Sequence, residues 1–558
     1  MSICRLSKLL APFVFAAIAG SVFADKQAQV FEADIIVYGG TSAAVTAAVQ
    51  AKSEGKSVIM VSPDMQLGAM TSSGLGFTDS GKASTIGGLS REFYHRVWKA
   101  YQDPNAWNWQ PRSSWKGSGQ GTKAINDKTK TMWVFEPKVA EKIYNCWLAE
   151  KGVIVHRNEK LLRDGEDGVE KSGEKIVAIK TLSGKKYVGK MFIDCTFEGD
   201  LMAAAGCEYH VGREANSVYG EDYNGFRATN KHNYHFFKSN IDPYKVEGDS
   251  SSGLLKYISG EKPLENGAGD KKVQAYCFRM CLTDNPANMI PVQKPDNYNP
   301  SDYDLCERYY RAEKYPAQMI VSSMPNLKTD CNNKNAFSTD FIGMNYDYPE
   351  ASYDEREKII EAHKNYQLGF LYFLQNDDRL PKWLRSKWSK FGLAKDEFEA
   401  TGGWPFNLYI REARRMVGDY VMTQADCQRK RATPNSIGMG SYTLDSHNTS
   451  RYVTKDGFVQ NEGDVEVGLK KPYMIAYGSI VPKKKDCSNL LVPVACSASH
   501  IAYGSIRMEP VFMILGQSAA TAASIAIDSD SCVQDVEYKK LSGKLRADGQ
   551  ILNDNDRK

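Results

Sequence analysis

The sequence has no Cys-x-x-Cys motif and no long block of lysine and arginine. Structural zinc sites and iron–sulfur clusters take closely spaced cysteines as ligands, so neither is expected and no metal site is predicted. The formal net charge is only +4 over 558 residues, which gives no basic surface for nucleic acid. The composition therefore indicates a globular protein whose partner is a small molecule.

Apolar runs long enough to cross a membrane are also lacking. The run over residues 9–23 is short, contains Pro12 and follows two basic residues. It ends in Val22-Phe23-Ala24, a pattern that predicts a secretory signal peptide over residues 1–24, cleaved after Ala24. We therefore expect a periplasmic or secreted protein without stable membrane insertion. An uncleaved N-terminal anchor is the alternative.

Cysteines are present but widely spaced, twelve in all. Cys4 lies in the predicted signal peptide, which leaves eleven, so at least one has no partner within the chain. An oxidising compartment favours one or two disulfides. The spacing leaves their pairing open.

A strand–turn–helix–strand unit follows the predicted signal peptide. Residues 34–38 form a short apolar run rich in β-branched side chains, and residues 39–42 are a Gly-Gly-Thr-Ser turn. Residues 43–54 are rich in alanine and end before Gly55, as helices commonly do. Residues 57–61 form the next buried strand. Two parallel strands around one helix make a right-handed βαβ unit.

The turn of this unit has part of the pattern of a dinucleotide-binding site. Such a site needs glycine where the strand turns sharply and where the backbone approaches a pyrophosphate, and a small residue where helix packs on strand. Gly39 supplies the turn, whereas Thr41 and Ala44 stand where the second and third glycines usually are. Two glycines after a strand also occur in other α/β turns, which is the alternative.

The second strand ends without the carboxylate that usually binds the adenosine ribose. Ser62 stands in its place, followed by Pro63 and Asp64. A serine hydroxyl can form one hydrogen bond to the ribose, and Asp64 is the alternative partner. The cofactor-binding residues predicted for this unit are Gly39, Gly40, Thr41, Ser42, Ala43, Ser62 and Asp64.

Patterning along the rest of the chain predicts a few strong elements. Helices are expected over residues 137–150, 353–376, 408–424 and 510–527, and strands over residues 153–155, 191–194 and 490–494. A charged hairpin is expected between about residues 159 and 187. Residues from about 215 to 335 lack a sustained period and are expected to form loops and short strands of an inserted domain.

Several motifs resemble those of the bacterial family of exported FAD-dependent oxidoreductases. They include the turn described above, Leu67-Gly-Ala-Met70-Thr71, Trp133-Val-Phe-Glu136-Pro137, and residues 194–201, 402–405, 411–415, 497–510 and 516–520. The resemblance covers nearly the whole chain after residue 30, apart from residues near 215–335. It implies a bound FAD, and it adds Gly68, Met70 and Thr71 to the predicted cofactor contacts.

The resemblance also implies a second cofactor contact far along the chain. In such flavoproteins a C-terminal strand returns to the Rossmann sheet, and the following helix directs its N-terminus at the flavin, which gains negative charge on reduction. Gly516 and Ala519 are small enough for close approach. An ordinary packed, alanine-rich helix is the alternative.

These expectations combine into an α/β fold. A Rossmann-like FAD-binding domain, of the type with two dinucleotide-binding domains, is interrupted by an inserted α+β substrate domain. The predicted boundaries are a signal peptide over residues 1–24, the first part of the FAD-binding domain over 30–215, the insertion over 216–484, the second part over 485–530, and a C-terminal tail over 531–558.

Hydride transfer to flavin requires a base for the departing proton, and histidine suits that role because its pKa lies near neutrality. His447 lies in a polar loop, and His500 precedes the helix expected to face the flavin. We favour His500 slightly. A hydrogen-bonded structural histidine is the alternative for each.

Arg411 is the third candidate catalytic residue. The predicted helix over residues 408–424 would place it on one face with Arg415. A buried arginine beside a flavin can bind an anionic substrate or the charge of the reduced flavin. A solvated helix face is the alternative.

The sequence thus predicts an exported FAD-dependent oxidoreductase that transfers a hydride from a small polar substrate to flavin. Aromatic residues make up 11% of the chain and would suit stacking on a sugar, so a carbohydrate is the first candidate substrate. The electron acceptor that reoxidises the flavin is left open. The alternatives are a polysaccharide lyase or hydrolase, since some relatives are labelled xanthan lyases, and a non-catalytic binding protein with a degenerate nucleotide fold.

Overall fold

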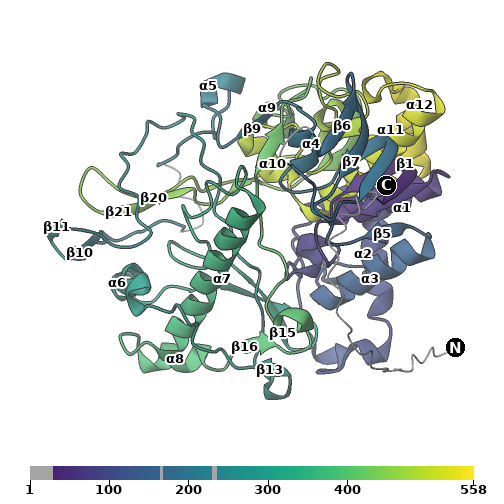
Figure 1. The fold of residues 1–558 in the computed structure, drawn as a ribbon. Helices are drawn as coiled ribbons and strands as arrows, with labels where there is room; N and C mark the ends of the chain where they lie inside the picture. Colours follow the sequence, from purple (N-terminus) through teal and green to yellow (C-terminus); the bar gives the residue numbers. More distant parts are fainter. Residues whose placement is uncertain (1–28, 164–166, 229–234, 558) are drawn as a thin grey trace, which may run out of the picture.

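The computed structural model describes residues 29–163, 167–228 and 235–557, so the predicted signal peptide lies outside the described residues. A seven-stranded sheet runs through the part of the molecule at the right of Figure 1. Its strand order is β5-β2-β1-β8-β7-β6, and β24 pairs with the C-terminal end of β8. The strands are β1 (Val30–Tyr38), β2 (Val58–Val61), β5 (Ile154–His156), β6 (Val169–Ser172), β7 (Lys175–Lys180), β8 (Lys186–Asp194) and β24 (Leu490–Leu491).

The central strands are parallel and buried on both faces. β1 pairs in parallel with β2 and with β8. Because side chains alternate along a strand, Ile35 and Val37 point into the larger apolar core, whereas Ile36 and Tyr38 point into a second, smaller one. The parallel βαβ arrangement confirms the predicted Rossmann-like α/β fold, and β24 returns to the sheet as expected.

Helices α1 (Ser42–Ser53) and α11 (Glu509–Asp528) pack side by side on one face of the sheet, as the purple and yellow ribbons of Figure 1 show. Glycine at position 516 permits this packing, because a Cβ there would lie 2.3 Å from the carbonyl oxygen of Ala43. Thr46 Oγ1 donates to the carbonyl of Met513 across the contact, at 2.9 Å. Against the expectation from the sequence, α11 is by length and composition apolar enough to cross a membrane, but it is buried within the protein, as a core helix is.

The inserted region forms the teal and green part at the left of Figure 1. Its core is a five-stranded antiparallel sheet made of β13 (Met289–Ile290), β16 (Gly392–Ala394), β12 (Cys281–Thr283), β15 (Lys328–Asn332) and β14 (Ile320–Met324). Helix α7 (Tyr353–Asn376) has the predicted bounds, and a capping box of Ser352 and Glu355 fixes its start. Helix α3 (Pro137–Glu150) of the first domain also matches its prediction.

Shorter elements connect these units. They are β3 (Ile125–Asn126), β4 (Thr131–Met132), α2 (Gly88–Ala100), α4 (Asp200–Ala204), β9 (Tyr209–Val211), α5 (Asn216–Tyr219), β10 (Tyr244–Val246), β11 (Asp249–Leu254), α6 (Asp304–Ala312), α8 (Lys382–Trp388), β17 (Arg414–Met416), α9 (Gln424–Cys427), β18 (Ser436–Gly440), β19 (Leu444–Ser446), β20 (Ser450–Val453), β21 (Val459–Glu462), β22 (Val465–Val467), β23 (Tyr473–Ala476), α10 (His500–Ile506) and α12 (Tyr538–Ala547).

The predicted helix over residues 408–424 is wrong. β17 pairs with β9 in antiparallel fashion, and only α9 at the end of the segment is helical. Neighbouring arginines point to opposite sides of the strand, Arg414 to Asp200 and Glu350, and Arg415 to Glu214. These buried ion pairs require an extended chain, so tertiary contacts override the helical spacing of the arginines.

Three further observations concern the C-terminal segments and the cysteines, and the domain boundaries stay predictions. The segment predicted as a tail forms α12, and Gln550 donates hydrogen bonds to the carbonyls of Ile437 and Ile514. β18 lies on α11, since a Cβ at Gly438 would be 2.3 Å from Ile514 Cγ2. This strand precedes the predicted boundary at residue 484, which stays a prediction. All eleven cysteines of the described residues are free thiols.

Candidate functional site

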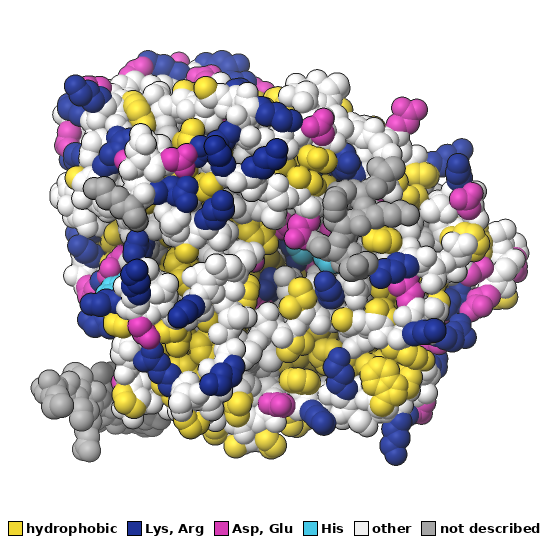
Figure 2. Space-filling model, turned by 180° about the vertical axis from the view of Figure 1, so that it is seen from behind, with side chains coloured by type: hydrophobic (Ala, Val, Ile, Leu, Met, Phe, Trp, Pro, Cys, Tyr) yellow, Lys and Arg dark blue, Asp and Glu magenta, His cyan; other side chains and the backbone are white. Residues whose placement is uncertain are grey.

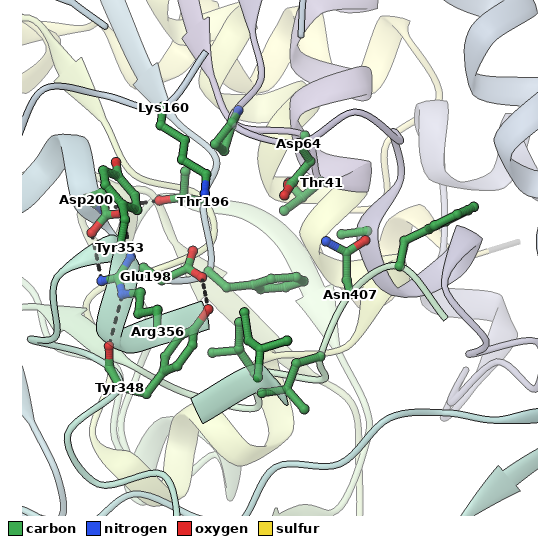
Figure 3. A pocket seen from close by; sticks show the side chains of 18 of the residues that line it. Thr41, Asp64, Lys160, Thr196, Glu198, Asp200, Tyr348, Tyr353, Arg356 and Asn407 are labelled. Carbon is green, nitrogen blue, oxygen red and sulfur yellow. Dashed lines mark hydrogen bonds and ion pairs between the residues drawn. The ribbon is translucent and has the colours of Figure 1, made fainter. Parts of the chain in front are cut away.

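A crevice opens where β1, β2 and β8 end. Its floor is lined by Gly40 and Thr41 after β1, by Pro63 and Asp64 after β2, and by residues 196–198 after β8. Residues around the start of α7 form the opposite wall, as Figure 3 shows. In open α/β sheets ligands bind outside the carboxyl ends of the strands, where the connections leave in opposite directions. The crevice therefore lies where a dinucleotide is expected.

The two glycines of the turn have different tasks. Gly39 has a φ of +131°, and a Cβ there would lie 2.7 Å from the backbone carbonyl of Cys195. It thus leaves room for the chain after β8, and not for the pyrophosphate as the sequence pattern suggests. Gly40 faces the crevice, and a Cβ there would lie 2.6 Å from Ser62 Oγ and 3.2 Å from Asp64 Oδ2.

The N-terminus of α1 opens on the same crevice. Thr41 is its N-cap: the hydroxyl accepts from the backbone N–H of Ala44 at 3.3 Å and donates to the carbonyl of Cys195 at 2.7 Å. The first N–H groups of a helix have no partner within it and carry partial positive charge, which suits a phosphate. Ser42 and Ala43 supply those groups. With Gly40 forming a surface without side chains, the turn fits the pyrophosphate of a dinucleotide.

Asp64, and not Ser62, presents its side chain to the crevice. The Ser62 hydroxyl is buried and bonds only to the backbone of Asp64, donating to its carbonyl at 2.9 Å and accepting from its N–H at 3.1 Å. Burial and the carboxylate of Glu198 raise the pKa of Asp64 to about 7. Of the two alternatives for the ribose contact, the geometry favours Asp64.

The wall opposite Asp64 carries a second group of charges, labelled in Figure 3. Arg356 donates to Asp200 at 2.7 and 3.0 Å, and the Tyr348 hydroxyl donates to Glu198 at 3.0 Å. Burial alone would raise the pKa of Asp200, but the guanidinium groups around it bring that pKa down to about 2. Asp200 therefore stays ionised and holds this wall in place.

The turn over residues 67–71 packs against the glycine turn. Gly68 donates its N–H to the carbonyl of Gly40 at 2.7 Å and has a φ of +98°. Thr71 Oγ1 donates to the Gly68 carbonyl at 2.8 Å and lies 2.9 Å from the Tyr144 hydroxyl. Met70 is fully buried. Of these predicted contacts Gly68 and Met70 line neither cavity, whereas Thr71 reaches the small one described next.

A second, small space lies at the N-terminus of α11. It is lined by Thr71, Tyr409 and residues 508–510, among others. Glu509 accepts from the Ser42 hydroxyl at 2.5 Å, so the first residues of α1 and α11 touch. Burial raises the pKa of Glu509 to about 7. The start of α11 thus lies against the start of α1. The resemblance implies that it is directed at the flavin, and that contact stays a prediction.

Gly516 and Ala519 lie two turns or more further along α11. Both are buried and line neither of these two cavities. The position of Gly516 is explained by the contact with Ala43. The geometry thus supports the alternative for these two residues, an ordinary packed helix, and a contact of α11 with the cofactor stays a prediction.

His500 is enclosed by hydrogen bonds. Nδ1 lies 2.7 and 2.9 Å from the two carboxylate oxygens of Glu412, and Nε2 lies 3.0 Å from the Ser446 hydroxyl. The residue is 1% exposed and, like His447, lines neither cavity. With both ring nitrogens engaged, its surroundings favour the structural alternative over the role of base.

His447 and Arg411 are brought together by a residue that the sequence pattern did not single out. His447 Nδ1 lies 2.6 Å from Asp340 Oδ2, and Arg411 Nη2 lies 2.9 Å from Asp340 Oδ1. Burial and the guanidinium of Arg411 lower the pKa of His447 below its ordinary value, against the opposing effect of Asp340. His447 is therefore neutral at neutral pH. Asp340 lies in a loop-rich stretch without periodic signal, which explains why it was missed.

Polar contacts connect this triad to the start of α11. Arg507 donates to the Tyr409 hydroxyl at 2.9 Å and to Asp445 Oδ2 at 2.7 Å. His447 Nε2 lies 3.9 Å from the same Asp445 oxygen, which is too far for a hydrogen bond. Tyr409 in turn lines the space at the α11 N-terminus. The sequence-predicted pair thus lies near the residues that precede α11, although it lines neither of the two cavities.

The surface around the site carries charges of both signs. Figure 2 shows basic and acidic side chains interspersed over one face, and a hollow near its middle in which histidine side chains are visible. Among the described residues, no group of three or more His, Cys, Asp or Glu side chains is arranged to hold a metal ion.

Comparison with known proteins connects this geometry to a family. The family model described as FAD dependent oxidoreductase matches residues 34–545, which include the sheet, the inserted region and α11. No curated protein matches the chain significantly.

Solved structures to which the chain is similar include two hydroxylases. OxyS anhydrotetracycline hydroxylase from Streptomyces rimosus matches at 11% identity, 33% of this chain, 36% of that chain and a TM-score of 0.22. CabE, an aromatic hydroxylase from angucycline biosynthesis, matches at 18% identity, 33% of this chain, 35% of that chain and a TM-score of 0.23. The chain spans about a third of the length of each. A geranylgeranyl bacteriochlorophyll reductase-like protein from Thermoplasma acidophilum matches at 11% identity, 93% of this chain, 85% of that chain and a TM-score of 0.33.

Proposed function

This chain belongs to the family of FAD dependent oxidoreductases, and from that premise we propose that it oxidises a small polar substrate, with His447 accepting the proton that leaves it. Bound FAD supplies the acceptor for the hydride. The observation that carries the proposal is the His447–Asp340 pair, whose neighbour Asp445 binds Arg507, two residues before α11.

The environment of His447 suits a base. Asp340 accepts a hydrogen bond from Nδ1–H, which leaves the lone pair on Nε2, and this tautomer is inferred from the carboxylate partner. Because its pKa is lowered by burial and by Arg411, the ring is neutral and able to take a proton at neutral pH. The side chain is 12% exposed, so a bound substrate can reach it.

The groups around Nε2 favour a substrate with hydroxyl groups. Asp445 lies on one side of the imidazole, and Arg507 and the Tyr409 hydroxyl continue the polar surface toward α11. A carboxylate, a guanidinium and a phenol bind hydroxyl groups from both the donor and the acceptor side. A carbohydrate alcohol is therefore the substrate class that we propose, and the N-terminal segment supports export to the periplasm or the medium.

Anaerobic flavin bleaching tests the proposal. Purified holoenzyme is mixed with mono- and oligosaccharides without oxygen, and the flavin absorbance is followed. We expect at least one sugar to bleach the flavin and to leave as the corresponding carbonyl compound. The control is the same sugar with its reacting hydroxyl replaced by hydrogen. Bleaching by a hydride donor without hydroxyl groups, and by no sugar, would contradict the substrate class.

A further inference from the structure

Two buried cysteines meet outside the site described above. Cys207 follows α4, and Cys487 precedes β24. They are 3% and 0% exposed, and both belong to the smaller core that contains Ile36 and Tyr38. Their thiols interact with each other, and the segments that carry them are in contact. Neither lines the crevice or contacts the His447 cluster.

The backbone on both sides holds the two thiols together. The Glu208 N–H donates to Asp486 Oδ2 at 3.3 Å. Lys171 Nζ bridges the two segments, donating to the carbonyl of Ala205 at 2.8 Å and to that of Asp486 at 2.7 Å. An ion pair between Lys483 and Glu208 at 2.6 Å adds a third connection. The approach of the thiols is therefore built into the fold and does not depend on one side-chain rotamer.

We propose that Cys207 and Cys487 form a disulfide when the protein meets an oxidising environment, and that the dithiol in this structure is the reduced form of that site. The inference is independent of the reaction proposed above, and it becomes relevant in the cell if the protein is exported. Disulfides persist outside the cytosol and are rare within it.

The oxidant is a disulfide of a second molecule, which reaches the buried thiols when the segments that carry them open locally. The exchange balances. The Cys487 thiolate attacks one sulfur of that disulfide and expels the other half as a thiolate. Cys207 loses its proton and attacks the Cys487 sulfur, which expels the second half. Two protein thiols are oxidised by two electrons to one disulfide, one external disulfide is reduced to two thiols, and the two protons pass to the thiols that leave.

The surroundings favour Cys487 as the attacking group. The hydrogen bond from Cys207, with help from the nearby charge of Lys171, lowers the pKa of the Cys487 thiol to about 7. A thiol with such a pKa is largely thiolate at slightly alkaline pH, and the thiolate is the nucleophile. In contrast, burial raises the pKa of Cys195 and of Cys306 well above the ordinary value.

The bond would tie together two segments that flank one strand. β24 pairs with the end of β8, and α4 follows that same end after Thr196, which lines the crevice. The disulfide would close a loop of nearly half the chain, which restricts the unfolded state strongly. We therefore expect the oxidised protein to melt several degrees higher than the reduced one.

Peptide mapping tests the inference on the full-length holoenzyme. The protein is dialysed to equilibrium against mixtures of oxidised and reduced glutathione, denatured with N-ethylmaleimide, digested and analysed by mass spectrometry without reduction. We expect a linked peptide pair containing Cys207 and Cys487 in the oxidised sample and its disappearance with dithiothreitol. Melting is measured on the same samples.

Two variants complete the design. Cys207→Ala should lose both the linked peptide and the dependence of melting on dithiothreitol, whereas the matched core variant Cys306→Ala should keep both. The wild-type map decides the question even if Cys207→Ala folds poorly. Wild-type protein with both cysteines alkylated in the most oxidising buffer, a link between other cysteines, or only a glutathione adduct on Cys487 would each overturn the inference.

Discussion

The Nδ1 atom of His447 lies 2.6 Å from the Oδ2 atom of Asp340, although the two residues are 107 positions apart in the chain. Asp340 also holds Arg411 at 2.9 Å through its other oxygen. One carboxylate thus fixes the orientation of both sequence-predicted residues. Because Nδ1 is engaged, only Nε2 of His447 is left to meet a substrate.

Replacing His447 by asparagine should leave the flavin bound but slow its reduction. General-base catalysis contributes roughly 10²–10⁴-fold to a rate, and asparagine keeps a polar side chain in the same place. Rapid mixing of flavin-loaded protein with substrate measures the reduction step alone. A rate within about threefold of the wild type, far from that range, would remove His447 from the reaction.

His500→Asn is the matched control and should behave in the opposite way. An asparagine amide can keep the contact with Glu412 but removes the partner that Nε2 gives the buried Ser446 hydroxyl, and losing a buried hydrogen bond costs about 1–3 kcal/mol. We expect a lower melting temperature and a lower flavin content, with a normal reduction rate in the holoenzyme that remains. A large loss of reduction rate at full flavin content would return the base to His500.

The rate of flavin reduction should depend on pH through His447. A base acts only when unprotonated, so activity is lost as the pH falls through its pKa. Burial and Arg411 lower that pKa below the ordinary 6.5, so the rate should be flat through neutrality and fall only in the acidic range. In Asp340→Asn the fall should move to still lower pH, because the carboxylate that raises the pKa is gone. An unchanged profile in this variant would show that another group titrates.

Valine at position 40 should prevent FAD retention in a folded protein. A Cβ there would meet Ser62 Oγ at 2.6 Å and would stand in the crevice. Gly39→Val should instead lower the yield of folded protein, since its Cβ would meet the Cys195 backbone at 2.7 Å. Gly543→Ala, in a helix with open space around it, serves as the control. Flavin content per folded protein separates the three, and full flavin in Gly40→Val would argue against the crevice.

Glu509→Gln should change how stability depends on pH. The folded-state pKa of Glu509 is raised from 4.5 to about 7 by burial. The folded protein thus keeps a proton that the unfolded chain releases, and stability is lost as the pH rises through this window. The wild type should lose about 3 kcal/mol relative to the variant between pH 4.5 and pH 7.

The melting temperatures of apo-protein and variant, followed from pH 5 to pH 8, measure this difference. In Ser42→Ala the carboxyl remains but loses the hydroxyl that stabilises its ionised form, so the window should extend to higher pH. Parallel melting curves for wild type and Glu509→Gln would show that this carboxyl is ionised at all these pH values.

Sequence patterns gave the local parts of the cofactor site correctly. The strand, glycine turn and helix over residues 30–53 are consecutive, so their period and turn residues suffice to predict them. The helices α3, α7 and α11 could be predicted in the same way, because each is long and its apolar residues recur with the helical period. Membership of the FAD dependent oxidoreductase family follows from such motifs, and the family match over residues 34–545 bears it out.

The chemistry beside the cofactor site was settled by contacts between distant residues. Nothing in the sequence distinguishes His447 from His500. In the structure Asp340 engages only Nδ1 of His447, whereas Glu412 and Ser446 engage both ring nitrogens of His500. The arginines at 411 and 415 have helical spacing, yet Asp200 and Glu214 pair with Arg414 and Arg415 on opposite sides of a strand.

The sequence by itself therefore determined the fold class and the cofactor turn, because both depend on the hydrophobic period and turn chemistry of neighbouring residues. The tertiary structure alone decided which carboxylate meets His447 and which cysteines lie together. Those pairings bring together segments more than a hundred residues apart, and no local pattern in a single chain records which buried charge will find which partner.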